Sequence, residues 1–254
     1  MSFEYKELGP DRYLVWDLLR ESDPYYLNQH IFDIDFTELE QNRELHRKDG
    51  KPAPSYVAYC LYAYSRVLNE FPLLNSYLRL YPLTKLALYK GVDISLTIER
   101  EWLGKRIVLL ALLKDAQNMK IEEIDAFLKS RKNDSLESLD EFSRYKSLLK
   151  IPAFLRWRLF QIFVKPFPGF LRQLVGTTAF TSIGKFGTDF TTPISPRTIT
   201  LSLGRVCERP RSVDGVVVSR LSAWLTLTYD HRVIDGADTA RAGERIRNML
   251  ENWS

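Results

Sequence analysis

The spacing of apolar residues changes along the chain, from a helical period in the first part to a strand period in the last third. Apolar positions three and four residues apart predict amphipathic helices, and these are expected at residues 11–22, 37–50, 55–71, 121–132 and 238–252. Thr37 and Glu40 have the spacing of a capping box at the start of the second helix. The helix at 55–71 is the most apolar and is expected at the centre of the core.

Strands are indicated where apolar and polar residues alternate, and the first of these segments is 28–36. Two alternating runs within 84–98 surround Lys90-Gly91 and predict a hairpin. The nearly continuous apolar run 106–113 is typical of a strand covered on both faces. From Thr177 onward long strand-like runs dominate. Helices early, strands late and little βαβ alternation predict an α+β fold with a mixed sheet.

Composition narrows the class of protein. The 254 residues are 45% apolar and 27% charged, as in ordinary globular proteins, and suit a single domain, 1–254, with elaborations. The formal charge of +4 does not indicate nucleic acid, although it suits an anionic cofactor. The N-terminus lacks the pattern of a signal peptide and no apolar run could span a membrane, so a cytoplasmic location is expected. Cys60 and Cys207 have no metal-type spacing, so no metal is expected.

The segment Tyr229–Ala237, YDHRVIDGA, carries the strongest chemical signal. A long apolar strand delivers His231 at its end, and strand ends commonly display reactive side chains on a rigid scaffold. Histidine is well suited to take a proton near neutral pH. A hydrogen-bonded core histidine is the alternative, but the other two histidines, His30 in a strand and His46 in a charged helix, look inert.

The HxxxDG pattern at His231–Gly236 resembles the signature of the chloramphenicol acetyltransferase-like superfamily. The longer form DHRVIDGA is similar to the acyltransferase (E2) component of 2-oxo acid dehydrogenase complexes. Fifty positions upstream, Thr181–Gly187 resembles the family segment with a hydroxyl residue followed by Ser-Leu-Gly, and residues 12–39 resemble its first helix and strand. The resemblance covers most of the chain, with 135–175 the least matched part. It implies a chloramphenicol acetyltransferase-like mixed sheet with flanking helices.

The resemblance also implies roles for individual residues. His231 would act as general base on a thiol, and Thr181 would donate a hydrogen bond to the oxyanion of the acyl group. Ser182 is the fallback donor, and cross-strand packing is the alternative role for Thr181, because the family usually places serine there. Asp235 is expected to be structural rather than proton-transferring.

In the superfamily this aspartate forms a buried ion pair with an arginine. The candidate partner in this chain is Arg12, with Arg20 as the second choice. Gly236 is expected to serve the tight turn after Asp235.

Coenzyme A or acyl-CoA is the substrate that the resemblance implies, and a homotrimer with each active site between neighbours is the implied assembly. No lipoyl-attachment domain or Ala/Pro-rich linker precedes residue 11. We therefore expect no covalently bound lipoyl group in this chain and an acyl donor supplied by a lipoyl or acyl carrier protein in trans, or by a free small molecule. The chain ends directly after its last helix, so a lone trimer is expected rather than a large shell.

Residues 135–175 are interpreted as a helical insertion interrupted by prolines. Within it, 150–175 combines aromatic and aliphatic residues with four cations, Arg156, Arg158, Lys165 and Arg172. An amphipathic helical pair on the core, a lid over a pantetheine arm or acyl chain, and a membrane-surface patch all remain open for it.

The leading hypothesis is thus a free-standing, homotrimeric CoA-dependent acyltransferase acting on a thiol or hydroxyl acceptor. The alternatives are a non-catalytic scaffold or binding protein of the same fold, and an E2-like component that acts on a lipoyl domain in trans.

Overall fold

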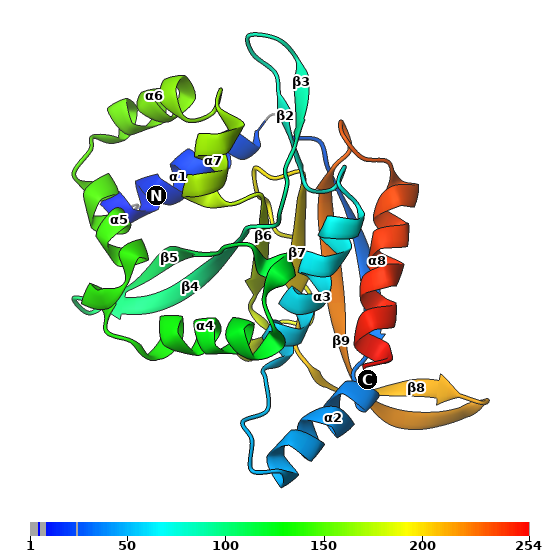
Figure 1. Ribbon diagram of the computed structural model, residues 1–254. Helices are drawn as coiled ribbons and strands as arrows, with labels where there is room; N and C mark the ends of the chain where they lie inside the picture. The colour runs from blue at the N-terminus through cyan, green and yellow to red at the C-terminus, as the bar shows by residue number, and fades with distance from the viewer. Residues whose placement is uncertain (1–4, 6–8, 24, 254) are drawn as a thin grey trace, which may run out of the picture.

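The computed structural model describes residues 5, 9–23 and 25–253. Its main feature is a mixed seven-stranded sheet (Figure 1). The strands are β1 (Leu27–Asp35), β4 (Ile94–Trp102), β5 (Lys105–Leu113), β6 (Thr178–Ser182), β7 (Ile199–Leu203), β8 (Cys207–Val213) and β9 (Val216–Asp230). They follow the order β1-β9-β7-β6-β4-β5, and β8 pairs with the N-terminal half of β9.

Parallel and antiparallel pairs occur together in this sheet. β6 runs parallel to β4 and β7, whereas β9 is antiparallel to β1, β7 and β8. The predicted α+β class with a mixed sheet is therefore confirmed. β9 is the longest strand and pairs with three others, so it fixes the position of the residues that follow its C-terminal end.

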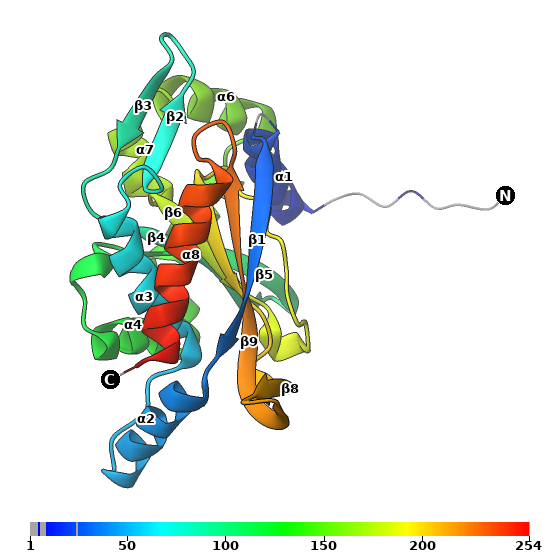
Figure 2. The ribbon, with the colours of Figure 1, turned by 90° about the vertical axis from the view of Figure 1, so that its right-hand side faces the viewer.

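The helices described are α1 (Pro10–Ser22), α2 (Thr37–Lys48), α3 (Tyr56–Glu70), α4 (Ile121–Asn133), α5 (Asp140–Leu149), α6 (Ala153–Phe163), α7 (Pro168–Val175) and α8 (Gly236–Glu251). Short 3₁₀ turns lie at Ala116–Asn118, Leu136–Ser138 and Gly184–Phe186. α3, α4 and α8 lie along one face of the sheet (Figure 2), while α1 lies among α5, α6 and α7 (Figure 1).

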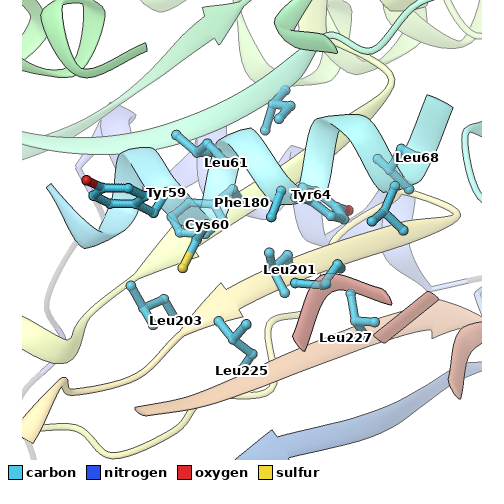
Figure 3. Packing of buried hydrophobic residues seen from close by; sticks show 14 of the residues in the cluster. Tyr59, Cys60, Leu61, Tyr64, Leu68, Phe180, Leu201, Leu203, Leu225 and Leu227 are labelled. Carbon is cyan, nitrogen blue, oxygen red and sulfur yellow. The ribbon is translucent and has the colours of Figure 1, made fainter. Parts of the chain in front are cut away.

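The core lies between α3 and the middle of the sheet. α3 begins at the N-cap Ser55, whose hydroxyl accepts a hydrogen bond from the Ala58 amide. Its buried side chains face leucines and a phenylalanine of β6, β7 and β9 (Figure 3). Cys60 is fully buried in this cluster, and burial raises the pKa of its thiol, so it is a packing residue.

Two expectations about strands were wrong. Residues 84–98 form no hairpin, because β3 (Lys85–Leu88) pairs with β2 (Ser76–Arg79) in a separate ribbon, whereas β4 pairs with β5 and β6. β5 is an edge strand, and in its first half Val108 is exposed between the buried Ile107 and Leu109. Only one face of that half is covered.

The predicted capping box at Thr37 is also absent. The N-cap of α2 is Phe36, and no side chain caps it. Glu40 instead accepts hydrogen bonds from Arg43, Arg47 and the Tyr56 hydroxyl. The Glu40 carboxylate is therefore bound by two arginines and a tyrosine and does not cap the helix.

Residues 135–175, which the sequence analysis interpreted as an insertion, form three helices, α5, α6 and α7, in a layer that packs on α1 and on β5. Phe142 and Tyr145 of α5 share a second apolar cluster with Ile107 and Leu109 of β5. The outer side of α6 remains apolar and exposed, for example at Phe154 and Phe163. Residues 135–175 are thus a helical layer over one end of the sheet, with an apolar cluster separate from the central core.

Candidate active site

His231 lies immediately after the last residue of β9. Its backbone amide donates a hydrogen bond to the carbonyl of Tyr26 over 2.8 Å, which ties the residue to the segment before β1. Its imidazole is 48% exposed and Nδ1 lies 3.9 Å from Oδ1 of Asp235. The histidine is therefore displayed at the end of a rigid strand, accessible to a second molecule.

The two neighbours of His231 form an ion pair with each other. Nε of Arg232 lies 2.9 and 3.0 Å from the two carboxylate oxygens of Asp230, and Nη2 lies 2.6 Å from Oδ2. Asp230 is completely buried, and its hydrogen bond to Arg232 raises the pKa of that guanidinium. The pair holds the backbone on both sides of the histidine in place.

The Arg232 guanidinium also stacks on Tyr25, at 4.7 Å from the ring centroid. Burial raises the pKa of Tyr25 to about 12, so it remains a neutral phenol. Sequence reasoning missed Asp230, Arg232 and Tyr25. The first two could have been found, since opposite charges two residues apart flank the histidine.

The expected buried ion pair of Asp235 is not formed, and this prediction was wrong for the single chain. The Asp235 side chain is 87% exposed, and among the described residues its ion-pair partner is His231. Arg12 is exposed, and Arg20 stacks on Trp16 and Trp157. Because α1 packs against the helices of residues 135–175, Arg20 contacts Trp157 of α6 and not the histidine loop.

Gly236 acts through close packing rather than through an unusual backbone angle. A Cβ at this position would lie 3.3 Å from the Tyr229 hydroxyl and 3.6 Å from Cε1 of His30. The Tyr229 hydroxyl in turn lies 3.3 Å from Nε2 of His30, and the Tyr229 and His231 rings are 5.8 Å apart. His30, expected to be inert, therefore lies beside the histidine loop.

Thr181 and Ser182 are the last two residues of β6. The Thr181 hydroxyl is 3.2 Å from that of Thr97 on the neighbouring β4. After them, Gly184 crosses the backbone of Gly204 so closely that a Cβ would meet its carbonyl oxygen at 2.5 Å. The glycine of this motif is needed because two segments of main chain touch there.

Within one chain Thr181 and His231 are far apart. Thr181 pairs with Ser202 of β7, which pairs with Thr226 of β9, five residues before His231. Five residues along a strand and two strand spacings amount to about 15–20 Å. Both side chains cannot reach one acyl group from the same chain.

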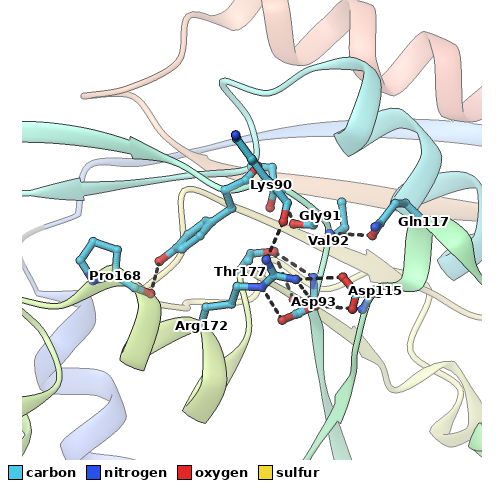
Figure 4. Close-up of polar contacts among 11 residues, drawn as sticks. Lys90, Gly91, Val92, Asp93, Asp115, Gln117, Pro168, Arg172 and Thr177 are labelled. Carbon is cyan, nitrogen blue, oxygen red and sulfur yellow. Dashed lines mark hydrogen bonds and ion pairs between the residues drawn. The ribbon is translucent and has the colours of Figure 1, made fainter.

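Three cations of the insertion are neutralised by carboxylates. Arg172 binds Asp93 through two nitrogens, at 2.6 and 3.0 Å, and reaches Asp115 at 2.9 Å (Figure 4). Arg156 pairs with an aspartate of α1 and Lys165 with a glutamate of α1. These pairs attach the helices of 135–175 to the sheet and to α1. Because three of the four cations of 150–175 are paired with carboxylates, little positive charge remains there for binding a membrane surface.

The catalytic-domain model of the 2-oxoacid dehydrogenases acyltransferase family matches residues 173–254. These residues include both Thr181 and His231. This segment of the chain is thus similar to the catalytic domain of the 2-oxo acid dehydrogenase acyltransferases. The resemblance predicted from the two motifs is confirmed by this match.

The chain is 26% identical over 201 residues to the dihydrolipoyllysine-residue succinyltransferase component of the 2-oxoglutarate dehydrogenase complex from Buchnera aphidicola. That alignment covers 78% of this chain and 40% of the relative, so the chain spans well under half of the relative's length.

Two solved structures show the fold. A probable dihydrolipoamide acetyltransferase from Listeria monocytogenes has a TM-score of 0.71 at 20% identity, covering 100% of this chain and 96% of its own. A chloramphenicol acetyltransferase has a TM-score of 0.53 at 14% identity, covering 98% of each chain. The chloramphenicol acetyltransferase-like fold is therefore confirmed.

In the described part of the chain no helix has the length and apolar character needed to cross a membrane. The same residues contain no group of three or more His, Cys, Asp or Glu side chains placed to hold a metal ion.

Proposed function

We propose that the chain is a CoA-dependent acyltransferase, in which His231 is the general base. The observation that carries the proposal is the display of His231 at the end of β9, half exposed and bracketed by the buried Asp230–Arg232 pair. The match of residues 173–254 to the acyltransferase family supports the reaction class. The proposed catalytic domain is 1–254, with a helical insertion at about 135–175.

The proposed step begins with a proton. Nδ1 of His231 lies 3.9 Å from Asp235, and we assign Nε2 as the nitrogen that takes the proton from the thiol of CoA or of the acceptor. The thiolate attacks the acyl carbonyl carbon, and the C=O electron pair moves to oxygen. When the tetrahedral intermediate collapses, the oxyanion's electron pair re-forms the C=O bond. The bond from carbon to the leaving sulfur or oxygen breaks, and the leaving atom keeps that bond's electron pair and receives the proton from His231.

The oxyanion needs a hydrogen-bond donor, and Thr181 of the same chain lies too far from His231 to provide it. We assign this role to Thr181 of a neighbouring subunit, with Ser182 as the fallback, in a homotrimer whose active sites lie between chains. The separation of about 15–20 Å within one chain supports this arrangement, since reacting groups must come within hydrogen-bond distance. In this assembly Asp235 and Gly236 shape the histidine loop.

The relatives are named for transfer to a dihydrolipoyllysine residue. We therefore propose a dihydrolipoyl group, on a lipoyl domain or an acyl carrier protein in trans, as the first acceptor to examine. Acyl-CoA is the second substrate, and the panel of acyl-CoAs described below identifies its acyl group.

The test is acyl transfer by His231→Ala, with His46→Ala as matched control. His46 lies in α2 and its Nδ1 contacts the carbonyl of Asn42, far from the strand end. Release of free CoA from a panel of acyl-CoAs, with dihydrolipoamide as acceptor, should fall at least 100-fold in His231→Ala and stay unchanged in His46→Ala. Near-normal turnover in His231→Ala would refute the mechanism, and an inactive wild-type chain with every acyl-CoA would favour the scaffold hypothesis.

A further inference from the structure

A cavity of about 180 Å³ lies between α1, α6 and the segment that enters β7. This is more than ten times the roughly 10–15 Å³ that one water needs. Its walls are mostly apolar, and they are formed by Leu14, Leu18, Leu148, Trp157, Phe160 and Val175. Charged residues lie among them, and their pairing determines what the cavity can hold.

Arg197 is the unusual residue of this lining. Its side chain is only 7% exposed, yet among the described residues no carboxylate lies within ion-pair distance of it. Nη1 and Nη2 donate to the carbonyls of Pro196 and Val175 over 2.7 Å, and Nε has no hydrogen-bond partner. A buried guanidinium normally has a counter-anion, because an uncompensated charge is costly to remove from water.

Each of the other charged residues of the lining has an ion-pair partner. Arg156 binds Asp17 at 2.6 Å, and Glu21 binds Lys165, which lies outside the lining, at 2.8 Å. Glu21 also accepts a hydrogen bond from Nε1 of Trp157. Among the described residues, Arg197 is therefore the charged residue of the lining that has no ion-pair partner.

We propose that this cavity binds a small monocarboxylate with an apolar chain, whose carboxylate pairs with Arg197. The carboxylate would supply the counter-anion that Arg197 lacks among the described residues, and two carboxylate oxygens can accept from a guanidinium side by side. The apolar chain of the ligand would lie against the leucines and Trp157. A phosphate, with more charge and no apolar part, matches neither the charge nor the walls.

The cavity lies at the same end of the sheet as His231. The carbonyl of Thr198, the residue after Arg197, accepts a hydrogen bond from the Asp230 amide over 2.9 Å. Tyr25 is close enough for the charges of both Arg197 and Arg232 to act on its hydroxyl. The site is nevertheless separate from the thiol chemistry proposed above, and its occupancy can be measured without any acyl transfer.

The test is calorimetric titration of the full chain with octanoate, compared with 1-octanol as a neutral ligand of the same chain length. Octanoate should bind at least tenfold more tightly than 1-octanol, a difference of about 1.4 kcal/mol. Arg197→Gln should weaken octanoate binding at least tenfold and leave 1-octanol unchanged. Arg158→Gln is the matched control, since Arg158 is exposed on the same insertion and does not line the cavity.

A second variant tests the chamber itself. Leu148→Trp places bulk into the cavity without altering any charge, and it should abolish binding of both ligands. Equal affinity for octanoate and 1-octanol, or unchanged octanoate binding in Arg197→Gln, would overturn the proposal. Absence of any heat with the wild-type chain would overturn it as well.

Discussion

Arg232 and Asp230, the two neighbours of His231 in the chain, form an ion pair in which three hydrogen bonds of 2.6 to 3.0 Å join the guanidinium to the carboxylate. The residue between them is thereby fixed at the end of β9, while its imidazole remains accessible. The arrangement replaces the support that the sequence suggested from Asp235 and Arg12.

Replacing Asp230 by Asn should therefore both destabilise the protein and impair the proposed reaction. The substitution leaves Arg232 without its buried counter-charge, and the free energy of unfolding should fall by about 3 kcal/mol. Asp238→Asn is the control, because its pair with Arg241 is exposed and should contribute less than about 1 kcal/mol. Urea unfolding of both variants measures the difference, and equal losses would show that the buried pair has no special role.

Gly236→Ala should displace the histidine loop. The added methyl would lie 3.3 Å from the hydroxyl of Tyr229, a fully buried residue that would have to shift slightly to accommodate it. We expect a loss of about 1 kcal/mol in unfolding free energy and a lower kcat. Adding Tyr229→Phe removes the contacting oxygen and should recover part of both. If the double variant has the same unfolding free energy and kcat as Gly236→Ala, contact with the Tyr229 hydroxyl is not the cause of the loss.

Gly184→Ala should disturb the end of β6, because the new methyl would meet the main chain of Gly204. Overpacking against backbone should cost about 1–3 kcal/mol, measured by thermal or urea unfolding. Gly169→Ala in α7 is the control, since a Cβ there meets nothing within 4 Å. The control should be neutral or slightly stabilising.

The Thr181 hydroxyl can be tested by one substitution that keeps it and one that removes it at constant side-chain size. Thr181→Ser keeps the hydroxyl and should retain most of the turnover, whereas Thr181→Val removes it and should lower kcat by about 100-fold or more. Similar activity of both variants would assign Thr181 to cross-strand packing. In that case Ser182→Ala becomes the next substitution to measure.

Mixing two inactive chains distinguishes a site between subunits from a site within one. If His231→Ala and Thr181→Val chains assort at random in trimers, about a quarter of the sites join an intact histidine to an intact threonine. Co-refolded mixtures should then regain about that share of the wild-type rate. Mixtures as inactive as their components would place both residues in one chain's site.

The sequence predicted the fold and the position of His231 well, because these depend on local pattern. The alternation leading to Asp230 and the helical spacing after Gly236 mark β9 and α8 whatever surrounds them. Pairing between distant segments was harder to predict. β3 pairs with the short β2, which the alternation did not reveal, and so the expected hairpin over 84–98 does not form.

The same limit applies to the site. Which arginine approaches which carboxylate depends on where α1 packs, and α1 is placed by contacts with the insertion. The partner of Asp235 could not be deduced for this reason. The sequence also could not show that Arg197 has no ion-pair partner among the described residues, because its surroundings are formed by α1, α6 and the segment before β7 together.

The distance between Thr181 and His231 has a consequence for mixed populations of the protein. Under the proposed assembly each chain serves two centres, giving its histidine to one and its hydroxyl to another. A single chain lacking both groups would silence two centres of a three-centre ring and leave one working. Defective copies would therefore act dominantly, and activity would fall faster than the fraction of sound chains.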